Sequence, residues 1–449
     1  MNELLSEQLS NKLRNKKVLV VGLGLQGGGV GLVKFLDKMG AEITVTDLRT
    51  ESQLASSIDK LKDISYKSTF GGHKEEDFLK ADIIFKGPSV PWTQPLIQKA
   101  EQTGVRVEME ASFFAAHCPV PIIGVTGTRG KSTVTHMISA ILKKAGRNVL
   151  LGGNIPNVST INLLSDIEDD AQVILELPSW HLSGFHRRHI SPHIGVFTNI
   201  FPDHLNYYKD MNEYVWDKKA IYLYQGSNDY LIANKNLEDV ISKDELKGTL
   251  HFFTGGDFTE SMKYLRGPHN AENAAAAAHV ARLLGIDESH IATSLSEFRG
   301  VPFRQEVVGT KDNVFFINDT TSTTPAATIA ALKSFPTEHT VLILGGDTKN
   351  LPTTELVEAL NSVNSIVLVK GSFTDEILID ISKKYPIKIS SVFSSLSEAV
   401  DAAYKRAAQI KSDAAYVLFS PSATSFAQFA NEFDRGGAFN QEVKKLTTL

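Results

Sequence analysis

The segment Gly124-Val-Thr-Gly-Thr-Arg-Gly-Lys-Ser-Thr133 follows an apolar run at 120–125 and precedes a stretch with helical periodicity at 133–144. A loop of small residues between a strand and a helix exposes successive backbone N–H groups, which bind phosphate oxygens at the helix N-terminus. In such a loop Lys131 contacts the β and γ phosphates of a nucleotide, and the hydroxyl of Ser132 binds Mg²⁺. This stretch therefore predicts an ATP-binding loop at the edge of a parallel sheet.

The loop departs from the strict GxxxxGK[ST] pattern at one position, because Val125 stands where the first glycine belongs. The later glycine and the strand–loop–helix context still favour a nucleotide loop over a turn that binds nothing. The residues that we predict to bind ATP here are Gly127, Thr128, Arg129, Gly130, Lys131, Ser132 and Thr133.

Acidic side chains follow two further apolar runs. Glu176 lies near the end of the run 173–177, and Asp203 and His204 follow the run 195–198. The carboxyl ends of parallel strands meet at one edge of a sheet, and Mg²⁺ prefers hard oxygen ligands. These residues predict a metal site beside the loop, although an ordinary surface acid or histidine is an equal alternative for each taken alone.

A second glycine-rich turn, Gly22-Leu-Gly-Leu-Gln-Gly27, follows the apolar run 18–21 and precedes a strand that ends at Asp47. This spacing matches the dinucleotide fingerprint, in which glycines approach a diphosphate and an acid about 20 residues later bonds a ribose. The same chemistry suits NAD or a uridine diphosphate, and a turn without a ligand is the third alternative.

Two later groups place polar residues at predicted element ends. His269-Asn270-Ala-Glu-Asn273 puts two amides on one helix face, where they suit an adenine ring or a substrate, with helix capping as the alternative for Asn270. Gly345-Gly-Asp-Thr-Lys349 follows the apolar run 341–344 and places an acid and a lysine at a sheet edge, with a simple turn as the alternative.

Alternation of apolar runs with helical stretches predicts an α/β protein. At about 150 residues per domain, 449 residues make roughly three domains. We predict a Rossmann-like domain at 1–115, a P-loop domain with a mainly parallel sheet at 116–303, and a second Rossmann-like domain at 304–449. The predicted strands are 18–21, 43–45, 83–85, 120–125, 173–177, 195–198, 230–233, 314–317, 341–344, 366–369 and 415–419.

Composition excludes several classes of protein. The chain is 42% hydrophobic and 22% charged, as in an ordinary globular protein. A net charge of -5 provides no general attraction to nucleic acid or anionic lipid. Cys118 is the single cysteine and closes no intrachain disulfide, which fits a reducing compartment. The acidic N-terminus is unlike a signal peptide, and no apolar stretch is long enough to span a membrane. We expect a cytoplasmic protein.

Taken together, these motifs resemble those of the Mur ligase family, and the similarity extends in order over essentially the whole chain. Its further motifs are Gly153-Asn154-Ile155, Asn199 to His204, Pro302-x-Arg304, Asn318-Asp319 and the segment from Ser420-Pro to Arg435-Gly436. The resemblance implies a monomeric enzyme of peptidoglycan precursor synthesis, and hence of cell-wall formation, cell shape and cell division. It uses ATP and two Mg²⁺ ions to add D-glutamate to UDP-N-acetylmuramoyl-L-alanine through an acyl phosphate.

The resemblance also implies roles for individual residues. Lys131, Glu176, His204 and Lys218 match the catalytic residues, and Ser132, Glu176, His204 and carbamylated Lys218 match the metal ligands. Asn270, Asn273, Arg304 and Asp319 match further ATP contacts. Leu25, Gln26, Asp47, Arg49 and Asn154 match the UDP-sugar contacts, and Thr323, Lys349 and Ser425 match the contacts to the amino acid.

The carbamylated lysine has two candidates, because Lys218 and Lys219 are adjacent; the flanking tyrosines of the family align with Lys218. Carbamylation requires a neutral amine, so the pKa of this lysine must be depressed.

The chain departs from the family pattern at three places. Pro178-Ser-Trp180 stands for Ser-Ser-Phe, Thr321 stands for a lysine, and Asn431-Glu-Phe433 stands for Asn-Phe-Glu. These positions concern substrate recognition, so a ligase that takes L-glutamate or another amino acid is the nearest alternative. Folylpolyglutamate synthases lack the first domain, an NAD-dependent dehydrogenase leaves the Lys131 loop unexplained, and a non-catalytic nucleotide-binding module leaves the metal-site residues unexplained.

Overall fold

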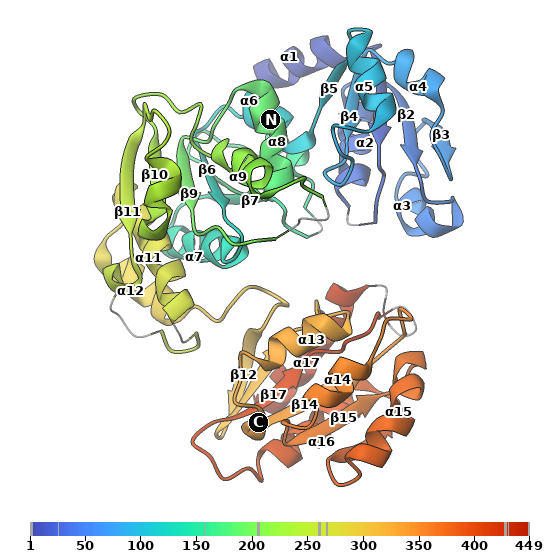
Figure 1. Cartoon of the computed structure of the whole chain (residues 1–449), viewed down its shortest axis with the longest axis vertical. Helices are drawn as coiled ribbons and strands as arrows, with labels where there is room; N and C mark the ends of the chain where they lie inside the picture. Colours follow the sequence, from blue (N-terminus) through green and yellow to red (C-terminus); the bar gives the residue numbers. More distant parts are fainter. Residues whose placement is uncertain are drawn as a thin grey trace. The chain divides into compact units, whose positions relative to one another are not determined.

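The computed structural model describes residues 3–25, 27–156, 158–203, 207–258, 262–265, 268–425, 429 and 431–447. The chain forms two compact units, Met1–Phe298 and Arg299–Leu449. The first unit contains two β-sheets and the second contains one, each flanked by helices (Figure 1). The predicted α/β class with three sheets is confirmed, and the domain boundaries at 115/116 and 303/304 stay predictions.

The first sheet is fully parallel, with the order β3-β2-β1-β4-β5. Helix α2 (Gly28–Lys38) packs on one face together with α1 (Glu3–Leu13), and α4 (Glu75–Leu79) and α5 (Pro95–Gln102) pack on the other. In a doubly wound sheet, ligands bind at the carboxyl edge where the strand order reverses, which here is the edge between β1 and β4. The strands are β1 (Lys17–Val21), β2 (Glu42–Asp47), β3 (Lys67–Phe70), β4 (Ile83–Lys86) and β5 (Arg106–Glu108).

The second sheet is also parallel, with the order β11-β10-β9-β6-β8-β7. Its strands are β6 (Ile122–Thr126), β7 (Val149–Gly153), β8 (Gln172–Glu176), β9 (Ile194–Phe197), β10 (Tyr230–Asn234) and β11 (Thr249–Phe253). The helices around it are α6 (Glu110–His117), α7 (Lys131–Lys144), η2 (Thr160–Ser165), α8 (Ser179–Arg188), α9 (Met211–Lys219), α11 (Pro268–Leu283) and α12 (Glu288–Ser296).

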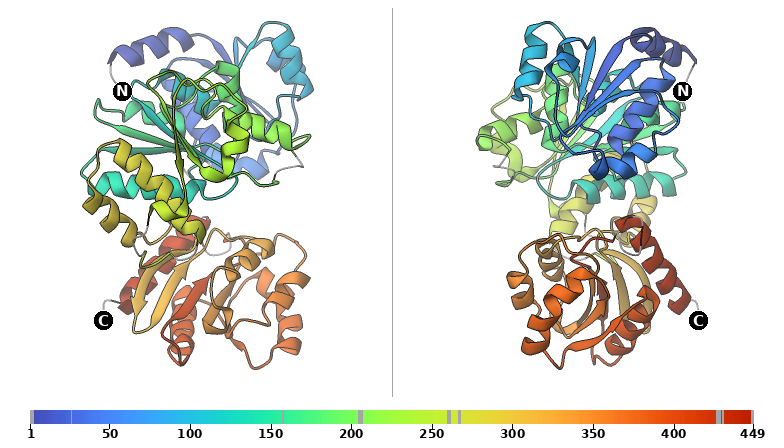
Figure 2. Two further views of the ribbon diagram at one scale, coloured as in Figure 1. Left: turned by 60° about the vertical axis from the view of Figure 1, so that its left-hand side comes forward. Right: turned by 90° about the vertical axis from the view of Figure 1, so that its right-hand side faces the viewer.

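Helices α7, α11 and α12 pack against one another over one face of this sheet, as the teal and yellow helices in Figure 2 show. The five alanines at 274–278 in α11 are completely buried. Alanine favours helix and its small side chain allows close packing of neighbouring helices, as the alanine run predicts. Helix α6 leaves the first sheet and packs against α8 and η2, so it joins the two sheets of the unit.

The third sheet has the order β12-β13-β17-β14-β15-β16, and only the edge strand β12 is antiparallel to its neighbour. Helices α16 and α17 pack on one face, and α13, α14 and α15 cover the other (Figure 1). The strands are β12 (Glu306–Lys311), β13 (Val314–Asn318), β14 (Thr340–Gly345), β15 (Ser365–Val369), β16 (Ile389–Phe393) and β17 (Ala415–Phe419). The helices are α13 (Pro325–Leu332), α14 (Thr354–Ala359), α15 (Ser372–Lys384), α16 (Leu396–Ala407) and α17 (Glu432–Thr447).

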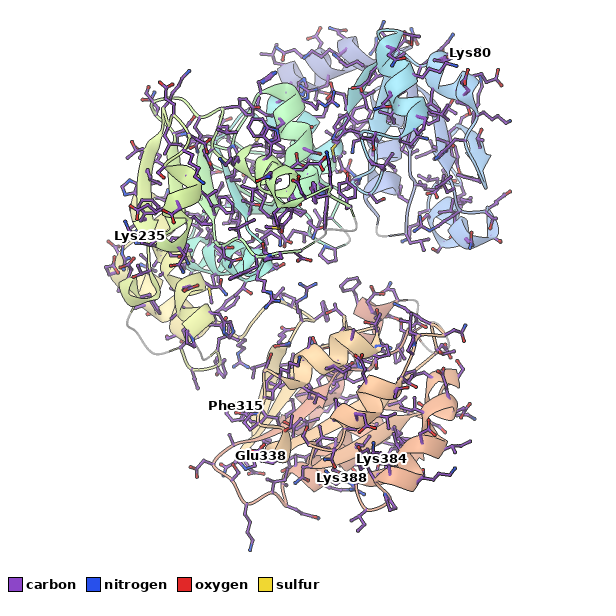
Figure 3. All side chains as sticks on the ribbon, in the orientation of Figure 1. Lys80, Lys235, Phe315, Glu338, Lys384 and Lys388 are labelled. Atoms are coloured by element: carbon purple, nitrogen blue, oxygen red, sulfur yellow. The ribbon has the colours of Figure 1, made fainter. Side chains whose placement is uncertain are left out.

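Charged side chains mostly point into solvent, as the labelled lysines at the periphery of Figure 3 show. Lys80 is 72% exposed and pairs with Glu76 one helical turn away. Such pairs contribute little to stability. None of the described helices is both long and apolar enough to cross a membrane.

We predict that Gly153→Ala destabilises the protein more than Gly146→Ala does. Both glycines have positive φ, of 81° and 76°, so either alanine carries the left-handed strain of about 1–2 kcal/mol. A Cβ at Gly153 would also lie 2.1 Å from the carbonyl oxygen of Glu176, whereas nothing lies within 4 Å at Gly146. Urea denaturation should show a loss of at least about 3 kcal/mol for Gly153→Ala. Equal losses in the two variants would contradict the tight contact.

Candidate functional site

The backbone of the phosphate loop is clamped between β6 and the segment after β9. Gly127 has φ 146°, and a Cβ there would lie 2.0 Å from Oγ1 of Thr198, so only glycine fits. The side chain of Asn199 accepts the N–H of Arg129 through Oδ1 (2.9 Å) and donates from Nδ2 to the Arg129 carbonyl (3.1 Å). The loop is therefore preorganised by its neighbours before any ligand binds.

The predicted amide pair of α11 lies against this loop. A Cβ at Gly130 would meet Oδ1 of Asn273 at 2.3 Å, and Nδ2 of Asn273 donates to Oδ1 of Asn270 at 3.4 Å. Asn270 is the third residue of α11, so it is not the N-cap of that helix. The helix thus brings the amide of Asn273, which is bonded to that of Asn270, against the predicted nucleotide loop from about 140 residues later in the chain.

Two lysines converge on the carbonyl oxygen of Gly127. Nζ of Lys131 donates to Gly127 (3.1 Å) and to Thr128 (3.0 Å), and Nζ of Lys218 donates to Gly127 at 2.8 Å. Lys218 is 1% exposed, and burial, reinforced by the charge of Lys131, holds its pKa well below the usual value. The nearby carboxylates of Asp203 and Asp217 oppose this shift.

The adjacent lysine has different surroundings. Lys219 lies 2.6 Å from the carboxylate of Asp244, which also accepts the hydroxyl of Tyr222 at 2.6 Å. Of the two candidates for carbamylation, only Lys218 touches the phosphate loop among the described contacts, and Lys218 has the depressed pKa that the chemistry requires.

Glu176 and Asn154 meet at the ends of β8 and β7. Glu176 is 2% exposed, and its Oε1 accepts Nδ2 of Asn154 at 3.1 Å. The backbone N–H of Asn154 also donates to the Glu176 carbonyl at 2.9 Å. A buried carboxylate at this edge offers a hard oxygen of the kind that Mg²⁺ takes. Ser132 and Thr133 lie in the first turn of α7, and the predicted ligand His204 lies outside the described residues.

Three of the predicted UDP-sugar residues, Leu25, Asp47 and Arg49, lie around the turn after β1. Oδ2 of Asp47 accepts the N–H of Gly24 (3.1 Å), and Oδ1 accepts the N–H of Arg49 (2.9 Å). Asp47 is buried and therefore holds the turn in shape, while Leu25 beside it is 48% exposed. Gln26, which we also predict to bind the UDP-sugar, lies outside the described residues.

The sequence analysis missed two buried basic residues near this edge. Lys86 ends β4, donates to the carbonyl of Val90 (2.8 Å) and lies 4.4 Å from the ring centroid of Trp92. Burial lowers the pKa of Lys86 to about 7, against the charge of Asp217. The sequence did contain a signal for Lys86. It comes directly after the apolar run 83–85, at the carboxyl edge of a predicted parallel strand, where ligand-binding residues are common.

The second residue is His181 in α8. Burial lowers its pKa to about 4, and its Nδ1 has no hydrogen-bond partner among the described residues. Buried polar atoms are normally paired, so this nitrogen is a candidate contact for a polar ligand. It follows Glu176 by five residues and comes directly after Pro178-Ser-Trp180, where the chain departs from the family pattern.

The second unit holds Asp319 at the end of β13. Its Oδ1 accepts the N–H of Gln305 (3.2 Å), and its Oδ2 accepts the hydroxyl of Ser420 (2.8 Å). Burial raises the pKa of Asp319 to about 6. Arg304 is exposed between Phe303 and Gln305, whose φ values of 64° and 50° are strained for residues with a Cβ.

The predicted amino-acid contacts lie along the carboxyl edge of the third sheet. Nζ of Lys349 donates to Oγ1 of Thr323 at 2.8 Å. Ser425 is 5% exposed and lines a cavity of about 20 Å³, the size of one water molecule, together with Asp347 and Arg435. Arg435 is buried, donates to the carbonyls of Ala423, Thr424 and Thr320, and forms no ion pair within the described chain.

Two departures from the family pattern also have structural partners in this unit. The hydroxyl of Thr321 donates to the carbonyl of Phe303 at 3.0 Å. The ring of Phe433 packs edge-on against the ring of Phe303, with 5.8 Å between centroids. Both substitutions therefore support the strained segment around Arg304.

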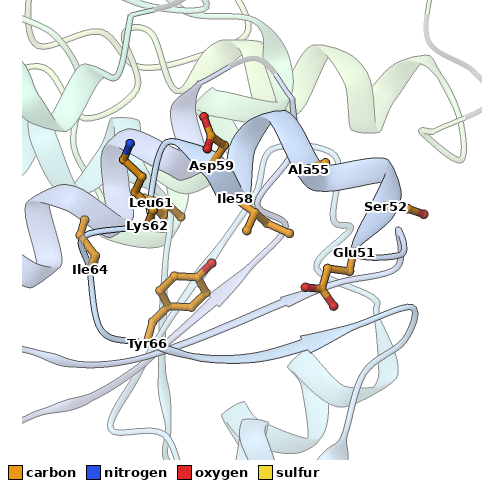
Figure 4. A pocket seen from close by; sticks show the side chains of 9 residues that line it. All are labelled: Glu51, Ser52, Ala55, Ile58, Asp59, Leu61, Lys62, Ile64 and Tyr66. Carbon is orange, nitrogen blue, oxygen red and sulfur yellow. The ribbon is translucent and has the colours of Figure 1, made fainter.

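A hollow of about 570 Å³ opens beside α3 (Ala55–Asp59) in the first unit (Figure 4). Tyr66 points toward the helix, and Glu51 and Asp59 lie at its rim. None of the predicted site residues lines this hollow, and its walls hold neither a phosphate loop nor a buried lysine.

Comparisons with known proteins identify the family of this chain. Residues 16–108 match the family model "Mur ligase MurD-like, N-terminal domain", and residues 125–249 match "Mur ligase middle domain". The UDP-N-acetylmuramoylalanine--D-glutamate ligase of Borreliella afzelii (strain PKo) is 37% identical over 465 residues, which cover 97% of this chain and 99% of that protein. The chain belongs to the Mur ligase family.

A second relative and a solved structure extend the comparison. The UDP-N-acetylmuramoylalanine--D-glutamate ligase of Roseiflexus sp. (strain RS-1) is 34% identical over 97% of this Mur ligase and 100% of its own chain. The crystal structure of MurF ligase from Thermotoga maritima, in complex with ADP, has a TM-score of 0.50 and 18% identity, covering 97% of each chain. The structure shows the shared fold, and the sequence relatives show the family.

We predict that Asp319→Asn removes a pH dependence from the stability of the second unit. Because the folded pKa of about 6 exceeds the ordinary 3.8, this group stabilises the fold most at low pH. Its contribution falls by up to about 3 kcal/mol as pH rises from about 4 to about 6. Asparagine stays neutral, so the unfolding free energy of the variant relative to the wild type should rise over that window. Urea titrations that show a constant difference would contradict the raised pKa.

Proposed function

We propose that this protein joins D-glutamate to UDP-N-acetylmuramoyl-L-alanine, with ATP as the source of energy. The observation that carries the proposal is the convergence of Lys131, Lys218 and Asn273 on one glycine-rich loop, in a chain whose full-length relatives have this name. The enzyme acts in peptidoglycan precursor synthesis, and hence in cell-wall formation and cell division. We infer that it is a cytoplasmic enzyme that acts as a monomer, as its resemblance to the family implies.

In this proposal the three domains share the binding of the substrates. The first domain, 1–115, takes the uridine diphosphate at Leu25, Gln26, Asp47 and Arg49, and Asn154 contacts the substrate from the second. The central domain, 116–303, takes ATP on the loop 127–133, with Asn270 and Asn273 toward the adenine. The third domain, 304–449, supplies Arg304 and Asp319 to the nucleotide, and Thr323, Lys349 and Ser425 to glutamate.

The reaction has two chemical steps. An oxygen of the alanyl carboxylate attacks the γ-phosphorus of ATP, the bond to ADP breaks, and an acyl phosphate forms. The neutral amine of glutamate then attacks the acyl carbon, loses a proton, and phosphate leaves as the amide forms. Both substrates are anionic, so the first step needs positive charge and N–H donors around the transferring group. Lys131 and the clamped amides of the loop provide them.

The chain also has donors suited to Mg²⁺. Glu176 is a buried carboxylate with one amide partner, and Ser132 lies in the first turn of α7. Ser132, Glu176, His204 and carbamylated Lys218 would hold two ions, which would neutralise charge on the phosphates. A carbamate at Lys218 would replace a buried amine by an anion. The anion would attract the ammonium group of Lys131, whereas a second ammonium group would repel it.

We predict turnover with D-glutamate and none with L-glutamate when the protein is incubated with UDP-N-acetylmuramoyl-L-alanine, ATP and Mg²⁺. Phosphate release and product mass measure the result. Lys131→Ala should reduce the rate at least about a hundredfold, by loss of a charge that stabilises the transition state. Lys143→Ala, an exposed lysine on the same helix, is the matched control.

Turnover with L-glutamate alone would leave the proposed mechanism intact but change the amino-acid substrate. The departures from the family pattern at Thr321 and Glu432 would then accompany a change of acceptor. The proposal would be contradicted if neither D-glutamate nor L-glutamate gave turnover, or if Lys131→Ala kept full activity.

We predict that Lys218, and not Lys219, carries a carbamate. Protein equilibrated with ¹³C-bicarbonate should show one carbamate carbon signal, because Lys218 faces the loop and burial holds its pKa well below the usual value, while Lys219 is paired with Asp244. The signal should persist in Lys219→Met and vanish in Lys218→Met. The opposite pattern, or no signal in the wild type, would overturn the assignment.

A further inference from the structure

We propose that Glu110 is a positioning residue that links the UDP-sugar edge of the first sheet to the Asn154–Glu176 pair of the second. Glu110 is the first residue of α6, which connects the two sheets. Its Oε1 accepts the hydroxyl of Ser159 at 2.8 Å and the backbone N–H of Ile161 at 3.0 Å. A carboxylate at this point satisfies N–H groups of the first turn of η2 that the helix itself leaves unbonded.

The other side of the carboxylate faces the first sheet. A Cβ on Gly28, the first residue of α2, would lie 3.5 Å from Oε2 of Glu110. Helix η2 packs directly on α2, because a Cβ on Gly31 would lie 2.1 Å from Cβ of Ser159 and Nδ2 of Asn162 donates to the Gly31 carbonyl at 3.3 Å. Glu110 therefore sits where the helix that follows the Gly22–Gly27 turn meets η2.

From η2 the contacts continue to the second sheet edge. Oγ1 of Thr160 accepts the N–H of Gly153 at 2.9 Å. The next residue, Asn154, bonds Glu176 through both its backbone N–H and its side chain. Two hydrogen-bonded steps, joined through adjacent residues of the chain, thus lead from Glu110 to the pair that we propose to contact substrate and metal. Displacement of η2 would move Gly153 and change the direction of the Asn154 amide.

Charge makes this position sensitive to substitution. Burial raises the pKa of Glu110, and the hydrogen bonds that the carboxylate accepts partly oppose this rise. The carboxylate forms no salt bridge within the described chain. Every recorded bond to it is accepted, so glutamine would replace one acceptor oxygen by an NH₂ donor beside the N-termini of α2 and η2. The shape of the side chain would be conserved. With its oxygen at Oε1 the amide would keep both of these bonds, so the change removes the negative charge beside the two helix N-termini and places a donor next to Gly28.

Glu108 provides a matched control, two residues earlier. It accepts Nε and Nη2 of Arg188 at 2.8 and 2.7 Å, so it also joins the first sheet to a helix of the second. Its bonds lead to the end of α8, away from Gly153. A substitution there removes an interdomain contact without touching the path to Asn154.

The experiment compares Glu110→Gln with Glu108→Gln in the full-length protein. Calorimetry measures the Kd of UDP-N-acetylmuramoyl-L-alanine and, separately, of ADP. We expect Glu110→Gln to weaken binding of the UDP-sugar about tenfold, as loss of a supporting contact commonly does, and to change the Kd of ADP less than twofold. Glu108→Gln should change both constants less than twofold, whatever its melting temperature. Ser159→Ala, which removes one of the two bonds, should give a smaller loss in the same direction and serves if Glu110→Gln does not fold.

Hydrogen exchange of the peptide spanning 153–165 provides a second measurement, which is independent of the proposed function. Exchange at Gly153 and Ile161 should accelerate in Glu110→Gln and stay unchanged in Glu108→Gln. The inference would be overturned if Glu110→Gln raised the Kd values of the UDP-sugar and of ADP equally, or if Glu110→Gln and Glu108→Gln had equal effects. Glu110 would then stabilise the fold in general without positioning the UDP-sugar site. Wild-type protein that binds no UDP-sugar would refute the proposed function, on which the substrate part of this inference rests, and the exchange result would then decide the positioning role.

Discussion

The carbonyl oxygen of Gly127 accepts hydrogen bonds from two lysines, and much of the site follows from that arrangement. Two ammonium groups that share one acceptor repel each other, and one of them, Lys218, is almost fully buried. The electrostatic solutions are an anionic ligand, a neutral amine, or conversion of one amine to an anion. A nucleotide triphosphate and a lysine carbamate would provide two of these, so the chemistry that we propose is compatible with the electrostatics of this loop.

The glycine itself is fixed by the same geometry. Residue 127 must be glycine because β6 and β9 are neighbours in the sheet and the side chain of Thr198 fills the space where a Cβ would stand. The parallel order brings Glu176 to the same edge from β8 on the other side of β6. Residues far apart in sequence therefore meet because parallel strands end together, which is the general basis of ligand sites in such folds.

The sequence located the interior of each sheet and missed its borders. Every predicted strand is an interior strand, whereas β3, β5, β7, β11, β12 and β16 were not predicted and all six are sheet edges. An interior parallel strand is buried on both faces and forms a continuous apolar run, but an edge strand such as Lys67–Phe70 can be polar. The site residues that we predict lie on loops after interior strands for the same reason, because those strands are the ones that the sequence locates. Lys86 and His181 were missed because their significance depends on burial between elements, which one-dimensional patterns do not report.

The central claim is that ATP activates the substrate carboxylate as an acyl phosphate before the amine attacks. The most direct test uses UDP-N-acetylmuramoyl-L-alanine with ¹⁸O in both oxygens of its alanyl carboxylate, incubated with this protein, ATP, Mg²⁺ and D-glutamate. Mass spectrometry should find one ¹⁸O in the released phosphate and one in the new amide carbonyl. Product formed with unlabelled phosphate would contradict the account, because the oxygen would not have passed through an acyl phosphate.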